Sequence, residues 1–334
     1  MQSHNIYFVG KNEIDVRNED VRKPSPHEVV IATKKTLIST GTETICLERR
    51  FEPGTGWDNW VKYPFAPGYS LSGVVIEKGA DVTSINVGDR VAARKPHHQY
   101  VTAEEDELVL IPAGVSDEDA TWFGLANITQ IGIRRAQHEL GDAVVVIGVG
   151  LLGQLVIQYL RLMGARQIIA IDFSETRLEL AAAHGATTTL AMGVEAAQDT
   201  IWELTEHGAD VVYDITGYAP VFAHAQGLLR KFGRLIVLGD TGTPSEQRLT
   251  HDVIKQGLTI VGAHDVHFPR KHTTDSYWNH LTMAQLFYTY LARGDMRVND
   301  LISHRYAPEQ ARDAYSMLIS DRSAAMGVVF DWEM

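Results

Sequence analysis

The chain has 334 residues, of which 45% are hydrophobic and 22% are charged. These values are typical of globular proteins and exclude disordered, collagen-like and fibrous classes. Its 30 basic and 42 acidic residues give a net charge of −12, which disfavours nucleic acids and anionic membranes as partners because both attract basic surfaces. The single cysteine, Cys46, excludes an internal disulfide framework and a zinc site built from several cysteines.

No segment of the sequence predicts insertion into a membrane. The longest apolar run, residues 143–153, contains three glycines and is too short to span a bilayer. Residues 1–13 lack an apolar stretch behind a basic start, so no secretory signal is predicted. We therefore expect a cytoplasmic protein.

Short apolar runs between turn residues mark the first third of the chain. The runs at 29–38, 71–79 and 89–94 cluster β-branched residues between Gly, Pro and Asp. They predict short strands of a β-rich domain, because each run is short for a helix and is flanked by residues that interrupt one.

From about residue 120, apolar strands alternate with amphipathic helices. A predicted helix at 122–139 comes first. The predicted strands are 143–148, 167–172, 211–215, 234–239 and 258–262. This alternation predicts an α/β fold with a doubly wound parallel sheet, whose ligands bind outside the carboxyl ends of the strands.

The last part of the chain has a mixed pattern. Helices are predicted near 283–293 and 308–319, and a final strand at 327–332. We expect this tail to pack on the first domain. The predicted domains are residues 1–122, residues 123–268 and a return segment at 269–334.

A glycine pattern directly follows the strand at 143–148 and opens a helix. Gly148, Gly150 and Gly153 form G-x-G-x-x-G in the context that a dinucleotide-binding turn requires. The first glycine allows the tight turn, the second the approach of a pyrophosphate, and the third close helix–strand packing. Amides near Leu151 and Leu152, at the helix start, would donate to the phosphates.

Asp172 ends the second strand of the predicted sheet, 19 residues after Gly153. This is the spacing of the acid that binds the adenosine ribose, and a carboxylate there repels a 2′-phosphate, so NAD is favoured over NADP. The alternative role of Asp172 is a cap of the following helix. Arg177, one helical turn further on, either approaches a 2′-phosphate or is a solvated charge on the helix.

The order of these elements and several short motifs resemble the medium-chain dehydrogenase/reductase (alcohol dehydrogenase-like) superfamily. The motifs are Gly41-Thr42-Glu43, Pro67-Gly68-Tyr69, Val87–Val91, the glycine pattern, Gly208–Val211 and Gly239. The resemblance implies a Rossmann domain inserted in a β-rich GroES-like catalytic domain, a small-molecule substrate and a homodimer. It also implies further cofactor contacts, at Asn127, Thr216, Leu238, Gly239 and His264.

The residues that bind catalytic zinc in this superfamily are replaced here. Their positions hold Thr40, Tyr69 and Phe123, none of which is an ordinary zinc ligand, and the four-cysteine lobe that holds a structural zinc is missing. We therefore predict no metal. The chain resembles a zinc-independent branch with sugar- and alcohol-dehydrogenase-like members and the bacteriochlorophyllide dehydrogenases.

Four residues are candidates for the chemistry that zinc would otherwise assist. Thr42 matches the position whose hydroxyl contacts the substrate alcohol; the alternative is a turn residue. Glu43 is either free for acid/base work, a partner of Tyr69, or a structural hydrogen-bond acceptor. Tyr69 is a donor to the substrate oxygen or packs on the cofactor. His97, in the loop before a strand, is a candidate acid/base or a polar surface residue.

Two tryptophans, Trp57 and Trp60, are candidates for the wall of a substrate pocket, where they would stack on a sugar ring. Packing within an aromatic-rich loop explains them equally well.

Three functions remain open. The first is a zinc-independent, NAD-dependent oxidoreductase that acts on a secondary alcohol such as a sugar, cyclitol or polyol. The second is an NAD(P)H-dependent enone or quinone reductase. The third is a dinucleotide-binding homologue without catalysis, because binding and catalysis share the glycine pattern.

Overall fold

The computed structural model describes residues 1–321 and 325–334, which form two compact units. The first unit contains Met1–Arg49, Gly56–Asn127 and Phe268–Met334, and the second contains Arg50–Thr55 and Ile128–His267. The second unit is thus an insertion within the first. The division falls inside helix α4 (Phe123–Ala136) rather than at its start, and the short segment Arg50–Thr55 also belongs to the second unit.

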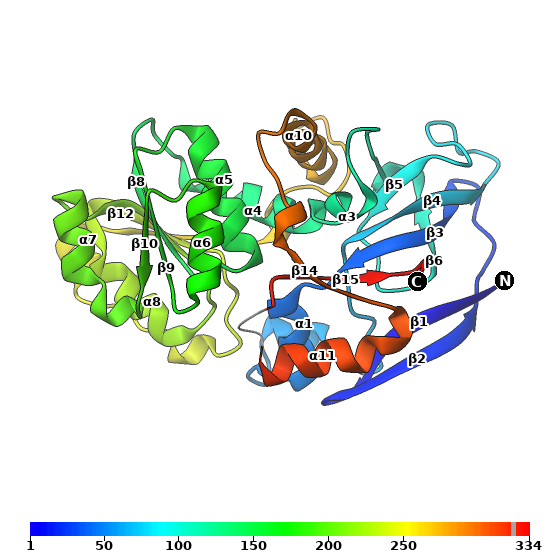
Figure 1. Ribbon diagram of the computed structural model, residues 1–334, viewed down its shortest axis with the longest axis horizontal. Coiled ribbons are helices and arrows are strands. Elements are labelled where there is room, and N and C mark those ends of the chain that lie inside the picture. The colour runs from blue at the N-terminus through cyan, green and yellow to red at the C-terminus, as the bar shows by residue number, and fades with distance from the viewer. Residues whose placement is uncertain (322–324) are drawn as a thin grey trace. The chain divides into compact units, whose positions relative to one another are not determined.

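The second unit is built on a six-stranded parallel sheet with the order β10-β9-β8-β11-β12-β13 (Figure 1). In terms of chain order within the sheet this is 3-2-1-4-5-6, the order of a Rossmann dinucleotide-binding fold. The strands are β8 (Ala143–Ile147), β9 (Gln167–Asp172), β10 (Thr188–Ala191), β11 (Ala209–Asp214), β12 (Leu229–Val237) and β13 (Thr259–Gly262). The helices are α5 (Leu151–Met163), α6 (Glu175–His184), α7 (Gln198–Thr205), α8 (Ala219–Gly227) and α9 (Asp252–Gln256).

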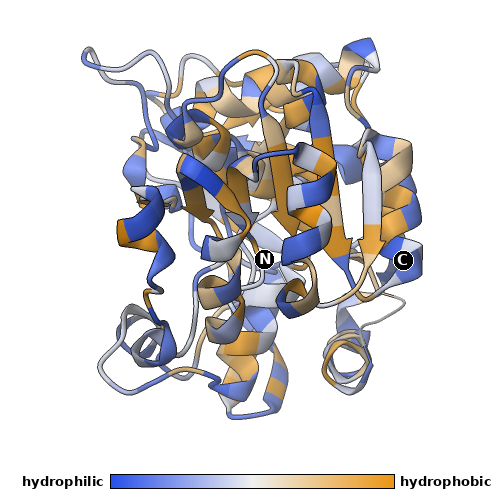
Figure 2. Ribbon diagram, turned by 90° about the vertical axis from the view of Figure 1, so that its left-hand side faces the viewer, coloured by the Kyte–Doolittle hydropathy of each residue, from blue (hydrophilic) through white to orange (hydrophobic). Residues whose placement is uncertain are grey.

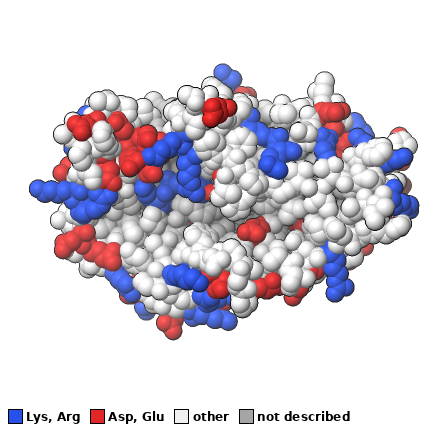
Figure 3. Space-filling model, turned by 180° about the vertical axis from the view of Figure 1, so that it is seen from behind, with Lys and Arg blue, Asp and Glu red and all other residues white. Residues whose placement is uncertain are grey.

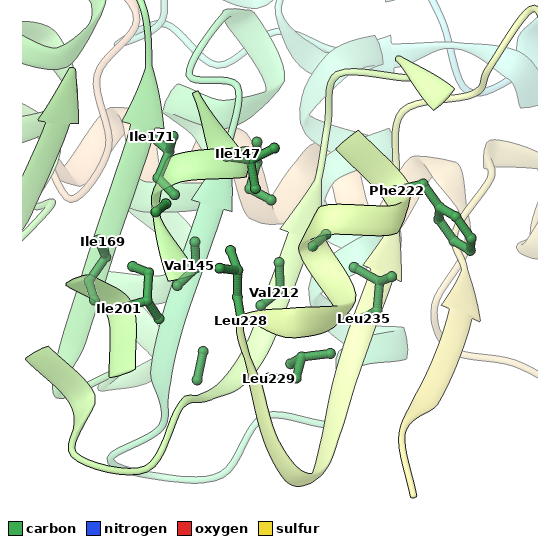
Figure 4. Close-up of a cluster of buried hydrophobic side chains, with 14 residues drawn as sticks. Val145, Ile147, Ile169, Ile171, Ile201, Val212, Phe222, Leu228, Leu229 and Leu235 are labelled. Carbon is green, nitrogen blue, oxygen red and sulfur yellow. The ribbon is translucent and has the colours of Figure 1, made fainter. Parts of the chain in front are cut away.

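Apolar side chains from both the strands and the covering helices form the core of this unit. Val145, Ile169 and Val212 from the sheet pack with Ile201 of α7 and with Leu228, which follows α8 (Figure 4). All five side chains are inaccessible to solvent. The strands are mainly apolar, whereas the helices alternate apolar and polar residues (Figure 2). This pattern is expected of a parallel sheet with helices on both faces.

The first unit contains a seven-stranded sheet with the order β14-β15-β3-β4-β5-β7, in which β6 also pairs with β3. Its strands are β3 (Glu28–Leu37), β4 (Leu71–Lys78), β5 (Arg90–Ala93), β6 (Tyr100–Glu104), β7 (Val109–Leu110), β14 (Ile302–Tyr306) and β15 (Gly327–Asp331). The C-terminal strand β15 pairs antiparallel with β3 and parallel with β14, so the tail completes the N-terminal sheet.

A separate hairpin, β1 (Gln2–Gly10) with β2 (Glu13–Asp20), joins this unit. The helices of the first unit are α1 (Thr40–Glu48), α2 (Gly56–Trp60), α3 (Asp117–Ala120), α10 (His280–Arg293) and α11 (Ala311–Ser320). None of the helices in the described residues has the length and apolar character needed to cross a bilayer. On the face drawn in Figure 3, acidic and basic side chains form small groups of both signs, separated by uncharged surface.

Candidate active site

The turn after β8 has the geometry that the glycine pattern predicts. Gly148 has φ +86°, a backbone conformation that residues with a Cβ rarely adopt. A Cβ on Gly153 would lie 2.3 Å from the carbonyl oxygen of Gly148, so only glycine permits this packing. A Cβ on Gly150, in contrast, would meet no atom within 4 Å. The turn is therefore tightly packed at Gly153 and leaves free space at Gly150. Leu151 and Leu152 form the start of α5, where backbone amides can bind phosphate, so the residues present fit a bound pyrophosphate.

Asp172 lies at the carboxyl end of β9, next to this turn. One carboxylate oxygen accepts a hydrogen bond from the Val149 amide at 2.9 Å, and the other accepts from the Ser174 amide at 3.0 Å. The two contacts hold the carboxylate between the glycine turn and the start of α6. Each carboxylate oxygen can still accept a further hydrogen bond, as a ribose hydroxyl would require.

Thr216, Leu238 and Gly239 lie at the same edge of the sheet as Gly148. The amides of Leu238 and Gly239 each donate to the backbone oxygen of Asp214 at 3.0 Å, and the Thr216 hydroxyl donates to the Asp214 carboxylate at 2.7 Å. Asp214 is buried, which raises its carboxyl pKa, and its Oδ2 atom has no partner among the described residues. These positions surround the ends of β11 and β12, where the ligands of such a sheet bind.

For the remaining predicted cofactor residues the structure shows contacts within the protein, and their contacts with a cofactor stay predictions. Arg177 lies in the first turn of α6, where its carbonyl accepts from Gln154. His264 is exposed, just after β13. Asn127 is fully buried and donates to the carbonyl of His280, while its Oδ1 atom has no partner in the described part of the chain.

In the first unit, Glu43 is the centre of a buried hydrogen-bond network. It lies in the first turn of α1 and is 1% exposed. Its Oε1 atom accepts from the Ser39 amide at 2.7 Å, and its Oε2 atom lies 3.0 Å from His97 Nε2 and accepts from the hydroxyl of Tyr315. Glu43 therefore has a structural role as the acceptor of this network, and acid/base work by its carboxylate stays a prediction.

The structure corrects the expectation for His97. Its side chain is fully buried rather than placed in an open loop, and a Cβ on Gly68 would lie 2.8 Å from its ring, so the histidine packs directly behind that turn. Its Nδ1 atom has no partner among the described residues. The burial contradicts the alternative of a polar surface residue, and a role of His97 as an acid/base stays a prediction. The burial of His97 could not be predicted, because a histidine in a predicted loop is usually exposed.

Tyr69 is half-buried, follows Gly68 and lies two residues before β4. Its hydroxyl donates to the Ser39 hydroxyl at 2.6 Å, and not to Glu43 as one alternative proposed. The guanidinium of Arg94 lies over its ring, 4.9 Å from the centroid. Burial raises the pKa of Tyr69, while hydrogen bonding to Ser39 and Thr42 and the charge of Arg94 act in the opposite direction. Thr42, itself half-buried, therefore belongs to the same group of polar residues.

These residues do not fit a zinc ion. Thr40 begins α1, Tyr69 is hydrogen-bonded to Ser39, and Phe123 is a buried apolar residue. In residues 1–321 and 325–334, no three His, Cys, Asp or Glu side chains group as metal ligands would. Cys46 is buried, and burial raises the pKa of its thiol, so it is not a ready thiolate.

The two tryptophans lie in and at the end of α2, and they differ in exposure. Trp57 is 8% exposed, its ring centroid 5.9 Å from that of Trp60. Trp60 is 52% exposed and makes an edge contact with Phe65. The packing interpretation therefore holds for Trp57, whereas Trp60 retains an accessible ring.

A dinucleotide-binding sheet inserted in a β-rich unit with a cluster of proton-donating side chains is the architecture of a nicotinamide-dependent oxidoreductase. The comparisons with known proteins agree. Residues 152–279 match the family described as zinc-binding dehydrogenase, and residues 25–113 match the alcohol dehydrogenase GroES-like domain.

Two similar relatives are an L-threonine 3-dehydrogenase of Bacillus subtilis and a D-guloside 3-dehydrogenase of Escherichia coli. The first is 30% identical over 71% of this chain and 75% of its own length, and the second is 33% identical over 48% of this chain and 47% of its own length. Among solved structures, a zinc-binding dehydrogenase of Sinorhizobium meliloti bound to NADP has a TM-score of 0.80 at 20% identity. A short chain alcohol dehydrogenase of E. coli complexed with NADH has a TM-score of 0.83 at 19% identity. Each of these two alignments covers 99% of both chains.

The chain belongs to the medium-chain dehydrogenase/reductase superfamily, the group that contains the alcohol dehydrogenases. It is an oxidoreductase of the alcohol dehydrogenase type with a nicotinamide cofactor and a small-molecule substrate.

Proposed function

We propose that this protein is a zinc-independent, NAD-dependent dehydrogenase that interconverts a secondary alcohol and its ketone. The single observation that carries the proposal is the hydrogen-bonded Tyr69 at the position where zinc-dependent relatives have a histidine ligand. Zinc in such enzymes polarises the substrate oxygen. A positioned hydroxyl donor is the chemical alternative, and such donors contribute about 10²- to 10⁴-fold to the rate.

A bound nicotinamide would supply the hydride chemistry. In the direction of ketone reduction, the Tyr69 hydroxyl turns its proton from Ser39 to the substrate oxygen and donates it there as the C–H bond forms at the carbonyl carbon, while the Ser39 hydroxyl donates to the phenol oxygen in its place. In alcohol oxidation Tyr69 takes the proton back. Ser39 orients the phenol, and Glu43 in turn holds the amide of Ser39 in place. Glu43 and His97 thus support Tyr69 from the interior without contacting the substrate.

The preference for NAD rests on Asp172. The carboxylate is fixed by two backbone amides, so it cannot easily turn away from a ribose bound beside it. A 2′-phosphate at that place would meet a fixed negative charge, which disfavours NADP.

A polyol, cyclitol or sugar is the proposed substrate class. Relatives at 33% and 26% identity are named D-guloside 3-dehydrogenase and sorbitol dehydrogenase. The exposed ring of Trp60 offers a flat apolar face of the kind on which a sugar ring can stack.

We propose a homodimer whose two copies pair through strand β13. This strand is an edge of the six-stranded sheet, and its residues are partly exposed. An edge strand carries unpaired backbone donors and acceptors that a second copy would satisfy. Light scattering coupled to gel filtration tests this: a mass near 74 kDa, roughly twice that of one chain, supports the dimer, and a mass of one chain contradicts it.

The decisive experiment combines metal analysis with kinetics on the purified protein. Sorbitol, myo-inositol and methyl glucosides are offered with NAD, and the zinc content of the same sample is measured. We expect turnover without stoichiometric zinc and without inhibition by a chelator, and a loss of kcat of about 10²-fold or more in Tyr69→Phe. Stoichiometric zinc whose removal abolishes turnover would contradict the proposal. Reduction of enones but no oxidation of alcohols would instead favour an enone reductase.

A further inference from the structure

The placement of Arg94 and Tyr69 is fixed by neighbouring strands. Tyr69 precedes β4 and Arg94 directly follows β5, and these strands pair antiparallel with Leu71 opposite Ala93. The two side chains therefore leave the sheet at the same end. The guanidinium lies over the aromatic ring with 4.9 Å between its central carbon and the ring centroid, within the range of a favourable cation–π contact.

The neighbouring basic residue is held differently. Lys95 forms an ion pair with Glu107 at 2.9 Å. The charged groups that act on the Tyr69 phenol are therefore Arg94, which favours its ionised form, and the buried Glu43, which opposes it. Of these two, only Arg94 stacks on the ring.

We propose that Arg94 is a positioning residue that acts through Tyr69: its stacked cation stabilises the negative charge left on the phenol oxygen when the proton is transferred to the substrate oxygen. In this step the O–H bond of Tyr69 breaks, an O–H bond forms on the substrate oxygen, and solvent later restores the proton. The inference rests on the proposed role of Tyr69. The charge of Arg94 thus assists the acid, Tyr69, rather than the substrate directly.

A titration of Tyr69 tests the electrostatic part without any substrate. The protein, which has 12 tyrosines, is labelled with 3-fluorotyrosine, whose phenol ionises at a lower pH than that of tyrosine, and followed by fluorine NMR. The signal of Tyr69 is identified by its loss in Tyr69→Phe. We expect its midpoint to rise by about one pH unit in Arg94→Met and to stay near the wild-type value in Arg94→Lys.

Arg49→Met is the matched control, because the Arg49 guanidinium lies over the ring of a different tyrosine, Tyr63, at 5.6 Å. It should leave the Tyr69 midpoint unchanged. Near-ultraviolet circular dichroism confirms that each variant is folded. An unchanged midpoint in Arg94→Met, or an equal rise in Arg94→Lys, would overturn the proposal.

The kinetic arm separates this inference from the proposed function. With a ketone that the enzyme reduces, the rate falls at high pH as Tyr69 loses its proton, and this limb should move to higher pH by the same amount in Arg94→Met. If Tyr69→Phe retains full activity, the proposed function fails whatever the titration shows. If Tyr69→Phe is inactive but the alkaline limb does not move in Arg94→Met, only the role of Arg94 fails.

Discussion

The Nε2 atom of His97 lies 3.0 Å from Oε2 of Glu43, and both side chains are withdrawn from solvent. The pair links the loop before β6 to the first turn of α1, and Tyr315 of α11 adds a third group. A buried carboxylate is stable only when its hydrogen bonds are satisfied, and here three protein donors surround it. The network therefore fixes the position of Ser39, on which Tyr69 depends.

Removing this carboxylate should destabilise the fold. Glu43→Ala leaves the Ser39 amide, His97 and the Tyr315 hydroxyl without their acceptor, and we expect a loss of about 3 kcal/mol or more in the free energy of unfolding, measured by urea denaturation. Glu43→Gln, which keeps the shape and one acceptor oxygen, should lose clearly less. Equal stability of Glu43→Ala and the wild type would show that the network contributes nothing.

His98 should make stability depend on pH. Burial lowers its pKa from 6.5 to about 4, outweighing the attraction of Glu19. Between these values the unfolded chain binds a proton that the folded protein excludes, so stability falls as the pH drops from 6.5 towards 4, with a slope of about 1.4 kcal/mol per pH unit from this group. Urea denaturation at several pH values should show a shallower slope in His98→Gln. An identical slope in both proteins would rule out this contribution.

Two glycines of the same turn should respond differently to alanine. A Cβ on Gly153 collides with the Gly148 carbonyl, so Gly153→Ala should cost about 2 kcal/mol of stability, as measured by chemical denaturation. A Cβ on Gly150 meets open space, so Gly150→Ala should keep its stability within about 1 kcal/mol. Binding of NADH, followed by its fluorescence, should nevertheless weaken at least about tenfold in Gly150→Ala, because the added methyl occupies the place of the pyrophosphate. Unchanged affinity would argue against a phosphate at this turn.

The charge of Asp172 should set the choice of cofactor. In Asp172→Asn the side chain can still accept from the Val149 amide but no longer repels a phosphate. We expect the ratio of kcat/KM for NAD to that for NADP to fall at least about tenfold, which corresponds to about 1.4 kcal/mol of lost discrimination. If the ratio stays constant, another residue, such as Arg177, governs the selection.

The parallel sheet could be predicted in detail because its signals are local. The run at 143–147 is continuously apolar, the glycines follow it directly, and Asp172 ends the next strand, so each feature lies in a short stretch of sequence. Strand β10 was not predicted. Its four residues, Thr188–Ala191, lie at the sheet edge, half of them exposed, and thus carry no apolar run.

The hydrogen-bond network that supports Tyr69 could not be predicted, because its residues are far apart in the sequence. Glu43 and Tyr315 are separated by 272 positions, and the burial of His97 is decided by its packing behind Gly68. Arg94 was likewise not singled out, since a single arginine after a strand has no distinctive pattern. Periodicity and spacing report neighbours along the chain, whereas these contacts depend on the tertiary fold.

Strand β15 is an interior strand of the first unit's sheet, between β14 and β3, and is formed by residues 327–331. During synthesis, the inserted nucleotide-binding unit has left the ribosome well before these residues are made, and domains generally fold as units while the chain emerges. The N-terminal strands, although made first, cannot close their sheet until residues 327–331 have been made. A nascent chain stalled before residue 327 would therefore hold a formed Rossmann unit and an unfinished β-rich unit.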